Sequence, residues 1–369
     1  MAKIVYIADV CKEIFAGGDV PKSALSYEKT AEYNVPIFSN GEKDCGLYGY
    51  TNNARVKEPS ITVSARGTIG YTAIRTEPFV PVVRLITLTP KSEVIDLDYL
   101  FYATQNYRFE GSGTSIPQLT VPMLKKYKFQ LPEMSHQKAI AVKFEKLDQL
   151  ISLRKQQLAK LDELVKAQFA NTFENDANFH TDYMENLSEF VTVGIANSAT
   201  HAYAEHGVVM LRNQNIKENH LDDTELVYIE PKFADKYKSK KLEANDILVT
   251  RTGYPGIACV VPQKYAGSQT FTTLIIRLKK GTNASSCYIC HYINSSHGKK
   301  YVSGTKVGVA QQNFGAKVLA KMPVIVPPIE LQNQFATFVA RIDQQKQTVQ
   351  QSLEKLELMK KALMQEYFG

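Results

Sequence analysis

The chain has 369 residues, more than twice the length of a typical single domain, so its length predicts at least two folded domains. Hydrophobic residues make up 44% and charged residues 22% of the sequence, which excludes a disordered or collagen-like protein. The 44 lysines and arginines outnumber the 37 aspartates and glutamates, and the formal net charge of +7 favours a polyanionic partner without requiring one.

Cysteine content and hydropathy predict where the protein works. The five cysteines are an odd number spread along a long chain, which argues against a disulfide framework. The N-terminal residues lack the apolar core of a signal peptide, and no apolar run approaches the roughly 18 residues of a spanning helix. The sequence therefore predicts a soluble protein of a reducing compartment, the cytoplasm, with no membrane partner.

Residues 1–134 mix strand and turn signals and predict a globular α/β unit. A β-branched run ends at Val63 and enters an arginine-containing turn with Gly67 and Gly70, the pattern of a strand that leads into a tight loop. A short helix is expected from Leu97 to Tyr107, followed by a polar loop at residues 113–118.

Residues 135–173 predict one long helix, because neither glycine nor proline interrupts them. Their apolar side chains repeat with the heptad spacing of a coiled-coil seam, which Arg154 interrupts. The side chains expected to pack against a partner helix are Phe144, Leu147, Ile151, Leu158 and Leu161.

Residues 174–327 predict a second α/β unit, entered through a linker rich in Asn, Asp and Phe. Val249 leads into a turn with Arg251, Gly253 and Gly256, which parallels the first turn at an offset of 186 positions, as from Gly67 to Gly253. A polar segment at residues 212–215 and a glycine-containing loop at residues 306–313 bring amide and basic side chains together.

The expected short helix from Ser286 to Asn294 contains the motif Cys-x-x-Cys-His at Cys287, Cys290 and His291. Covalent haem attachment uses this motif but requires export, and a zinc site would need a second pair of ligands. We therefore expect Cys290 to pack in the core, and no metal site.

Residues 328–369 predict a second long helix that duplicates the first. Gln137 and Gln332 lie 195 positions apart, and the same offset relates Asp148 to Asp343. The packing residues of this helix are expected to be Val339, Ile342, Val349, Leu353 and Leu356. Neither helix can bury its apolar stripe alone, and the simplest partner for each is the other, in an antiparallel pair.

Motifs of catalysis are missing from the sequence. There is no phosphate-binding loop, no dinucleotide fingerprint, and no acidic-Pro-Pro-aromatic motif of the amino-methyltransferases, so no catalytic residue is assigned. Base edges are read by the side chains of Arg, Lys, Asn and Gln, so polar loops that carry these residues are the candidate DNA contacts. The alternative is that these loops are only hydrophilic surface. The DNA-binding candidates are Arg66, Thr114, Gln118, Arg212, Gln214, Lys306, Gln312 and Asn313. Arg66 and Arg251 could instead brace their turns.

In its order and duplication the chain resembles the DNA-specificity (S) subunit of type I restriction-modification systems, over essentially its whole length. Asp9 to Gly18 and Leu187 to Gly194 resemble the openings of target-recognition domains. Leu131 to Gln137 and Val326 to Gln332 resemble the entries to the spacer helices.

The resemblance implies an α/β (α+β) fold with an internal pseudo-two-fold repeat. Target-recognition domains at 1–134 and 174–327 would be separated by two long antiparallel coiled-coil helices, at 135–173 and 328–369. It implies that each domain reads one half of a bipartite, asymmetric site in double-stranded DNA, and that the helices fix the spacing and dock two methyltransferase (M) subunits. Restriction and translocase (R) subunits would complete the complex.

The resemblance also implies that this chain is not an enzyme and holds no cofactor. S-adenosylmethionine, ATP and Mg would belong to the partner subunits. An enzyme of nucleic-acid metabolism with its own active site, and a coiled-coil scaffold without DNA contact, are the alternatives, and a steep salt dependence of DNA binding would exclude the scaffold.

Overall fold

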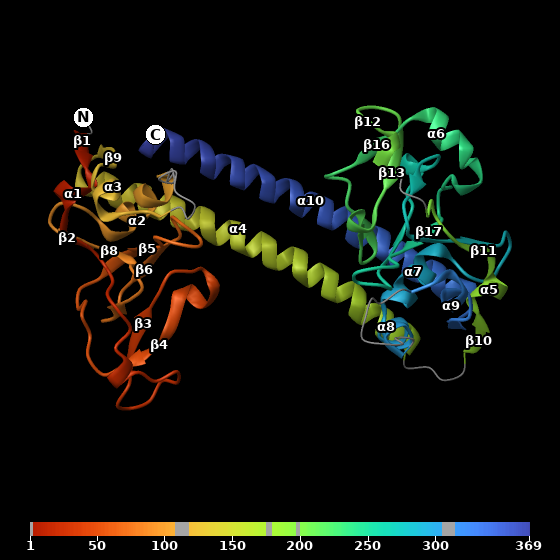
Figure 1. Ribbon diagram of the computed structural model, residues 1–369, viewed down its shortest axis with the longest axis horizontal. Helices are drawn as coiled ribbons and strands as arrows, with labels where there is room; N and C mark the ends of the chain where they lie inside the picture. The colour runs from red at the N-terminus through yellow and green to blue at the C-terminus, as the bar shows by residue number, and fades with distance from the viewer. Residues whose placement is uncertain (1–2, 108–117, 175–178, 197–199, 305–313) are drawn as a thin grey trace. The chain divides into compact units, whose positions relative to one another are not determined.

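The computed structural model describes residues 3–107, 118–174, 179–196, 200–304 and 314–369 (Figure 1). Its contacts divide the chain into two compact units. Unit 1 comprises residues 1–157 and 349–369, and unit 2 comprises residues 158–348. Both units mix helices and strands, which confirms the predicted α/β class. The four-part division at residues 134, 173 and 327 stays a prediction.

The described part of unit 1 contains a two-stranded sheet, β1-β9, and two larger sheets. The first of the larger sheets has the order β2-β8-β5-β6 and is antiparallel, and the second has the order β4-β3-β7 with a parallel β3-β7 pair. The strands are β1 (Lys3–Tyr6), β2 (Cys11–Ala16), β3 (Val35–Phe38), β4 (Leu47–Thr51), β5 (Ser60–Val63), β6 (Thr72–Arg75), β7 (Val80–Pro81), β8 (Ile86–Pro90) and β9 (Lys128–Leu131). The helices are α1 (Ile7–Val10), α2 (Leu97–Asn106) and α3 (Val121–Lys125).

Unit 2 repeats this plan. Its sheet order β11-β20-β17-β18 matches that of unit 1, and its second sheet, β12-β16-β13-β19, again contains a parallel pair. The strands are β10 (His180–Tyr183), β11 (Ser188–Val193), β12 (Tyr203–Ala204), β13 (Val208–Leu211), β14 (Ile216–Lys217), β15 (His220–Leu221), β16 (Val227–Ile229), β17 (Ile247–Val249), β18 (Ala258–Val260), β19 (Gln269–Thr270), β20 (Leu274–Leu278) and β21 (Pro323–Val326). The helices are α5 (Met184–Leu187), α6 (Pro231–Lys236), α7 (Ser286–Asn294), α8 (Ser296–Gly304) and α9 (Ala316–Ala320).

The two predicted long helices are present as α4 (Met134–Phe169) and α10 (Ile329–Phe368). Helix α4 ends four residues earlier than expected, at Phe169, because residues Ala170–Glu174 form a π-helical turn. No described helix is both long and apolar enough to cross a bilayer.

Within each unit, one end of α4 runs antiparallel to one end of α10. In unit 1, Asp148 pairs with Lys360 at 2.5 Å and Lys155 with Glu357 at 3.1 Å. In unit 2, Asp162 pairs with Lys346 at 2.5 Å, and the Phe169 and Phe335 rings lie 5.5 Å apart. Lys346 and Lys360 lie 195 positions after the apolar Ile151 and Val165 of the first long helix. At these positions of the heptad pattern the second helix therefore carries lysines that form ion pairs with the first.

The ten side chains expected to pack between the helices are all removed from solvent to some degree. Phe144, Leu147, Ile342, Val349 and Leu353 are buried. The half-buried ones are Ile151, Leu158, Leu161, Val339 and Leu356.

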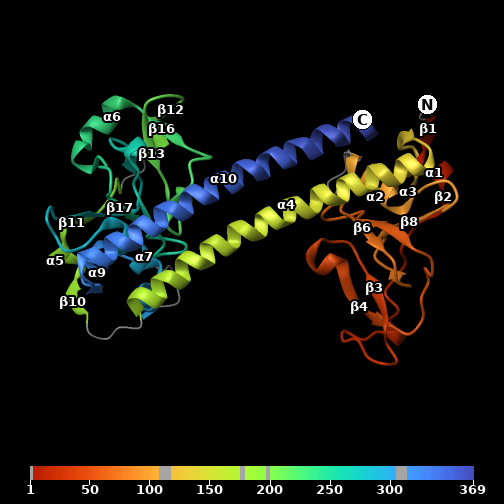
Figure 2. The same ribbon diagram turned by 180° about the vertical axis from the view of Figure 1, so that it is seen from behind.

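Each unit has its own core, with a fully buried tyrosine from its short helix at the centre. Tyr99 of α2 donates to Gln130 O, and Tyr288 of α7 donates to Ile325 O, both at 2.6 Å. In unit 2, α7 lies against the start of α10 (Figure 2), where the His291 and Phe335 rings are 5.0 Å apart. Cys290 is 1% exposed within this core, which confirms its predicted role in packing.

Candidate nucleic-acid interface

A hairpin turn of the same shape follows the β5 strand of unit 1 and the β17 strand of unit 2. In unit 1, Ser64 N donates to Tyr71 O (2.8 Å) and Gly70 N to Ser64 O (2.9 Å). Gly67 and Gly70 have φ values of 69° and 88°, a left-handed conformation that glycine adopts at little cost.

The turn of unit 2 repeats these hydrogen bonds and angles. Thr250 N donates to Ile257 O (2.8 Å) and Gly256 N to Thr250 O (3.0 Å). Gly253 and Gly256 have φ values of 74° and 89°. The offset of 186 positions in the sequence therefore reflects a real structural repeat.

The turn of unit 1 brings two predicted DNA-binding residues together. The exposed Arg66 guanidinium donates to Gln118 Oε1 at 3.0 Å, and Leu119 N donates to Ala65 O at 2.9 Å. Asn40 supports the turn from the end of β3, because its Oδ1 accepts from Ala65 N at 2.7 Å. Arg66 is therefore held at the surface by an amide and is not neutralised by a carboxylate of the described residues.

The turn of unit 2 presents different side chains on the same backbone. Thr252 replaces Arg66 in the repeat, and its Oγ1 accepts from Asn213 Nδ2 at 2.9 Å. Tyr254 stands at the tip of the turn and is 85% exposed. An exposed ring at a loop tip can stack on a base or donate its hydroxyl to one, whereas a guanidinium pairs with the acceptor edge of guanine.

Two other predicted contacts of unit 2 are engaged within the protein. Arg212 Nη2 donates to Glu225 O at 2.9 Å, and Gln214 Nε2 donates to Glu225 Oε2 at 3.2 Å. Glu225 therefore occupies one nitrogen of each of these two side chains. Thr114, Lys306, Gln312 and Asn313 lie outside the described residues.

A buried glutamine near the start of each long helix forms hydrogen bonds to the segment where a short helix begins, α2 in unit 1 and α7 in unit 2. Gln137 Oε1 accepts from Asp96 N (2.8 Å), and its Nε2 donates to the carbonyls of Val94 and Pro132. Gln332 makes the same three bonds to Ser285 N (2.9 Å), Asn283 O and Pro327 O. The sequence showed that the two glutamines were repeated, but only the structure shows that they position the helices.

The Cys-x-x-Cys-His motif offers no ligand set. Burial raises the pKa of the Cys290 thiol and lowers that of His291 to about 4, and no group of three metal-ligating side chains exists among the described residues. Asp246 instead pairs with a cation: Arg277 donates to it at 2.7 and 2.8 Å, and these bonds raise the pKa of the guanidinium.

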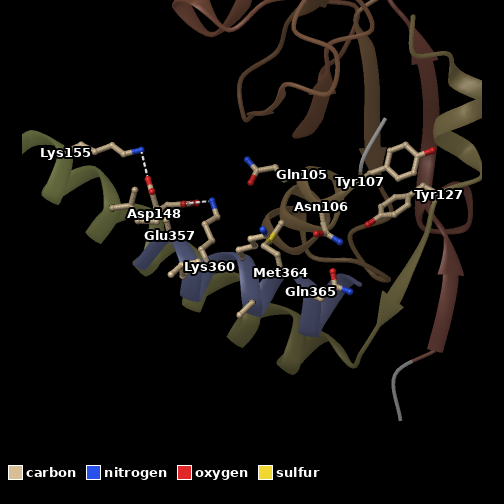
Figure 3. A pocket seen from close by; sticks show the side chains of 14 residues that line it. Gln105, Asn106, Tyr107, Tyr127, Asp148, Lys155, Glu357, Lys360, Met364 and Gln365 are labelled. Atoms are coloured by element: carbon tan, nitrogen blue, oxygen red, sulfur yellow. Dashed lines mark hydrogen bonds and ion pairs between the residues drawn. The ribbon is translucent and has the colours of Figure 1, made fainter. Parts of the chain in front are cut away.

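A groove of unit 1 lies between the end of α2 and the facing ends of α4 and α10 (Figure 3). Its lining includes the ion pairs Lys360–Asp148 and Lys155–Glu357 (Figure 3). Because carboxylates neutralise these cations, the groove is a weaker candidate for a polyanion than the hairpin turns.

Comparison with known proteins identifies the family. The sequence profile described as "Type I restriction modification DNA specificity domain" matches residues 2–163 and 181–358, one stretch in each half of the chain. Two proteins of Mycoplasma pneumoniae that are described as type I specificity subunits are 37% identical over 145 residues and 38% identical over 139 residues. These alignments cover 39% and 38% of this chain, and about two fifths of the length of each relative.

Solved structures show the same fold. The S subunit of a type I restriction-modification system from M. genitalium superposes with a TM-score of 0.61 at 15% identity, covering 100% of this chain and 96% of that one. A second structure, described by the assembly and conformational transition of the type I system, also gives 0.61, at 12% identity and with 99% and 97% coverage. Since the profile spans most of the sequence, the chain belongs to the family of DNA-specificity subunits of type I restriction-modification systems.

Proposed function

We propose that the chain is the non-catalytic recognition subunit of a type I complex, and that each unit reads one half of a bipartite, asymmetric site in duplex DNA. The observation that carries this proposal is the repeated hairpin turn. Its backbone is the same in both units, yet it presents Arg66 beside Gln118 in one and Thr252 and Tyr254 in the other.

A shared scaffold with different side chains suits the reading of two different half-sites. Base identity is read by side chains in the groove, while the scaffold sets how deep those side chains reach. Arg66 is fitted to a guanine edge, and Tyr254 to stacking or a hydrogen bond at another base. The two halves of the site would therefore differ in sequence, as the two turns do.

The long helices would act as a ruler between the half-sites. Each is uninterrupted by glycine or proline, so α4 alone spans about 54 Å at 1.5 Å per residue. The ion pairs of Lys346 and Lys360 and the buried glutamines would hold the antiparallel pair and its units in register.

Chemistry would come from the partner subunits in the cytoplasm. Two M subunits docked on this chain would bring S-adenosylmethionine and methylate the site, and R subunits would bring ATP and Mg for translocation and cleavage. This assignment of recognition to the chain and of catalysis to its partners is supported by family membership and by the lack of catalytic motifs in the sequence.

The test replaces one reader at a time in the full chain, co-expressed with the M subunit of its own host. We expect Arg66→Ala and Tyr254→Ala each to relax the methylated sequence in one half-site and to leave the other unchanged, as mapped on genomic DNA. Methylation that is identical in both variants and the wild type would contradict the assignment. DNA binding that does not weaken with salt would indicate a scaffold instead.

A further inference from the structure

A shallow groove lies next to the hairpin turn in each unit. It is found beside the end of β2 in unit 1 and beside the end of β11 in unit 2. In unit 1 it is lined by Gly17, Arg84, Gln118 and Thr120, among others. In unit 2 it is lined by Gly194, Tyr237, Lys240 and Ala316, among others. No aspartate or glutamate is among the described residues that line either groove.

The two grooves are equivalent positions of the repeat. Gly17 N donates to Leu85 O at 2.8 Å, and Gly194 N donates to Thr273 O at 2.9 Å. A side chain at Gly17 would lie 2.6 Å from Pro81 O, and one at Gly194 would clash with Thr270 O. Glycine therefore lets the strand end pack closely against its neighbour, and this leaves the same hollow in both units.

Among the described residues that line each groove, one side chain is cationic, Arg84 in unit 1 and Lys240 in unit 2. The two come from different parts of the repeat. Arg84 belongs to the turn before β8, where unit 2 has Thr272 with a similar φ (63° and 57°). Lys240 comes from the segment that follows α6, and its Nζ donates to Thr192 Oγ1 at 2.7 Å. A positive charge thus occurs at the same place although the residues that supply it are not related by the repeat.

Neither cation is neutralised within the described part of the chain. No carboxylate of the described residues forms an ion pair with Arg84 or Lys240. By contrast, Lys264, Lys299 and Lys321 each lie 2.6 to 2.7 Å from a carboxylate oxygen.

Both grooves adjoin the turns proposed to read bases. Gln118 lines the groove of unit 1 and also accepts from Arg66. In unit 2, Phe314 N donates to Arg251 O of the turn at 3.1 Å, and Ala316, two residues later, lines the groove. A duplex whose bases meet the turns would therefore bring phosphates to the grooves.

We propose that the two grooves bind the phosphate backbone of duplex DNA, with Arg84 and Lys240 as the phosphate contacts. The inference rests on the proposed function, because it takes the hairpin turns as the base-reading elements. Phosphate contacts position a protein on the duplex and carry no sequence information.

The experiment measures the affinity of the full chain with its M subunits for a duplex carrying the methylated site, across a range of salt concentrations. We expect Arg84→Gln and Lys240→Gln each to weaken binding about tenfold near 0.1 M salt and to lower the slope of log K against log salt by about 0.9. Target and scrambled duplexes should be weakened alike, and the methylated sequence should stay the same. Arg84→Lys and Lys240→Arg should restore most of the affinity.

The matched control is Lys321→Gln, which removes the same charge from a lysine already paired with Glu185. Groove variants that behave like this control, with a wild type that binds DNA in a salt-dependent way, would overturn the phosphate assignment alone. A changed methylated sequence would also overturn it, because the groove would then read bases. A wild-type complex without salt-dependent DNA binding would overturn the proposed function as well.

Discussion

His291 is a titratable side chain in the core of unit 2, at the position that Tyr102 holds in unit 1. Each lies six residues after the N-cap of its short helix, Ser285 and Asp96. The His291 ring lies 5.0 Å from that of Phe335, and burial, with a smaller contribution from Lys346, lowers its pKa to about 4. Unit 2 therefore folds with this imidazole neutral.

This burial predicts a pH dependence of stability. An unfolded histidine has a pKa of about 6.5, so between about pH 6.5 and pH 4 the unfolded chain binds a proton that the folded chain does not. The free energy of unfolding should thus fall by a few kcal/mol as the pH drops through this range. Denaturant titrations at pH 7 and pH 5 measure this decrease in the unfolding free energy. His291→Phe should remove the part that comes from His291, whereas substitution of an exposed histidine, His206→Gln, should leave the decrease unchanged. An unchanged pH dependence in His291→Phe would contradict the prediction.

Gln332 satisfies three backbone groups in a site that is closed to solvent. Gln332→Leu would leave one N–H and two carbonyls without partners, at a cost of about 1 to 3 kcal/mol for each buried group that water does not reach. We expect a loss of about 3 kcal/mol or more in the unfolding free energy, measured with denaturant. Gln334→Leu, on the exposed face of the same helix, should change it by less than about 0.5 kcal/mol. Equal effects of the two variants would show that Gln332 is not an anchor.

At the level of elements, the end of each long helix completes the core of one unit. Phe368 at the end of α10 packs 5.0 Å from the Tyr99 ring, and Phe173, after α4, packs 4.9 Å from the Tyr288 ring. Phe173 and Phe368 are related by the 195-residue repeat. Phe173 belongs to the π-helical turn that follows α4.

Replacing Phe173 or Phe368 by alanine should therefore lower the unfolding free energy by about the same amount. Phe368→Ala and Phe173→Ala should each lower the unfolding free energy by roughly 3 to 5 kcal/mol, because each leaves a cavity among aromatic rings. Leu358→Ala serves as the control, since Leu358 is 67% exposed on α10. If one phenylalanine proved no more important than Leu358, that helix end would not belong to the core.

The long helices and the glycine turns could be predicted from the sequence, because the absence of glycine and proline and the position of paired glycines are local signals. The side-chain contacts that support the turns could not be predicted from the sequence. Asn40 and Asn213 support equivalent turns, but their spacing of 173 positions differs from the 195 of the helices, since loops of different length intervene. The engagement of Arg212 and Gln214 by Glu225 depends on how the segment before β16 packs, which no local pattern reveals.

At the level of the whole molecule, the net charge of +7 is less informative than the location of the cations that remain unpaired. Many lysines and arginines of the described residues form no ion pair, and Arg66, Arg84 and Lys240 are three of them. All three lie at or beside the hairpin turns. The basic balance of the sequence therefore gains meaning only when the fold brings particular side chains together.

We propose that the two equivalent units read separate half-sites at a distance set by the long helices. Seven residues inserted after Gln157 and seven after Thr348 would lengthen both helices by one heptad and keep their seams aligned. The added length, about 10 Å, corresponds to about three base pairs of duplex. Seven residues appended after Gly369 are the control, because they lengthen neither helix between the units.

The deciding measurement is a map of methylated positions in host DNA for the inserted, the appended and the unaltered chain. Two unchanged half-sites separated by about three more base pairs in the inserted chain alone is the result that we predict. Half-sites of altered sequence with an unchanged separation would show that the helices do not set the spacing.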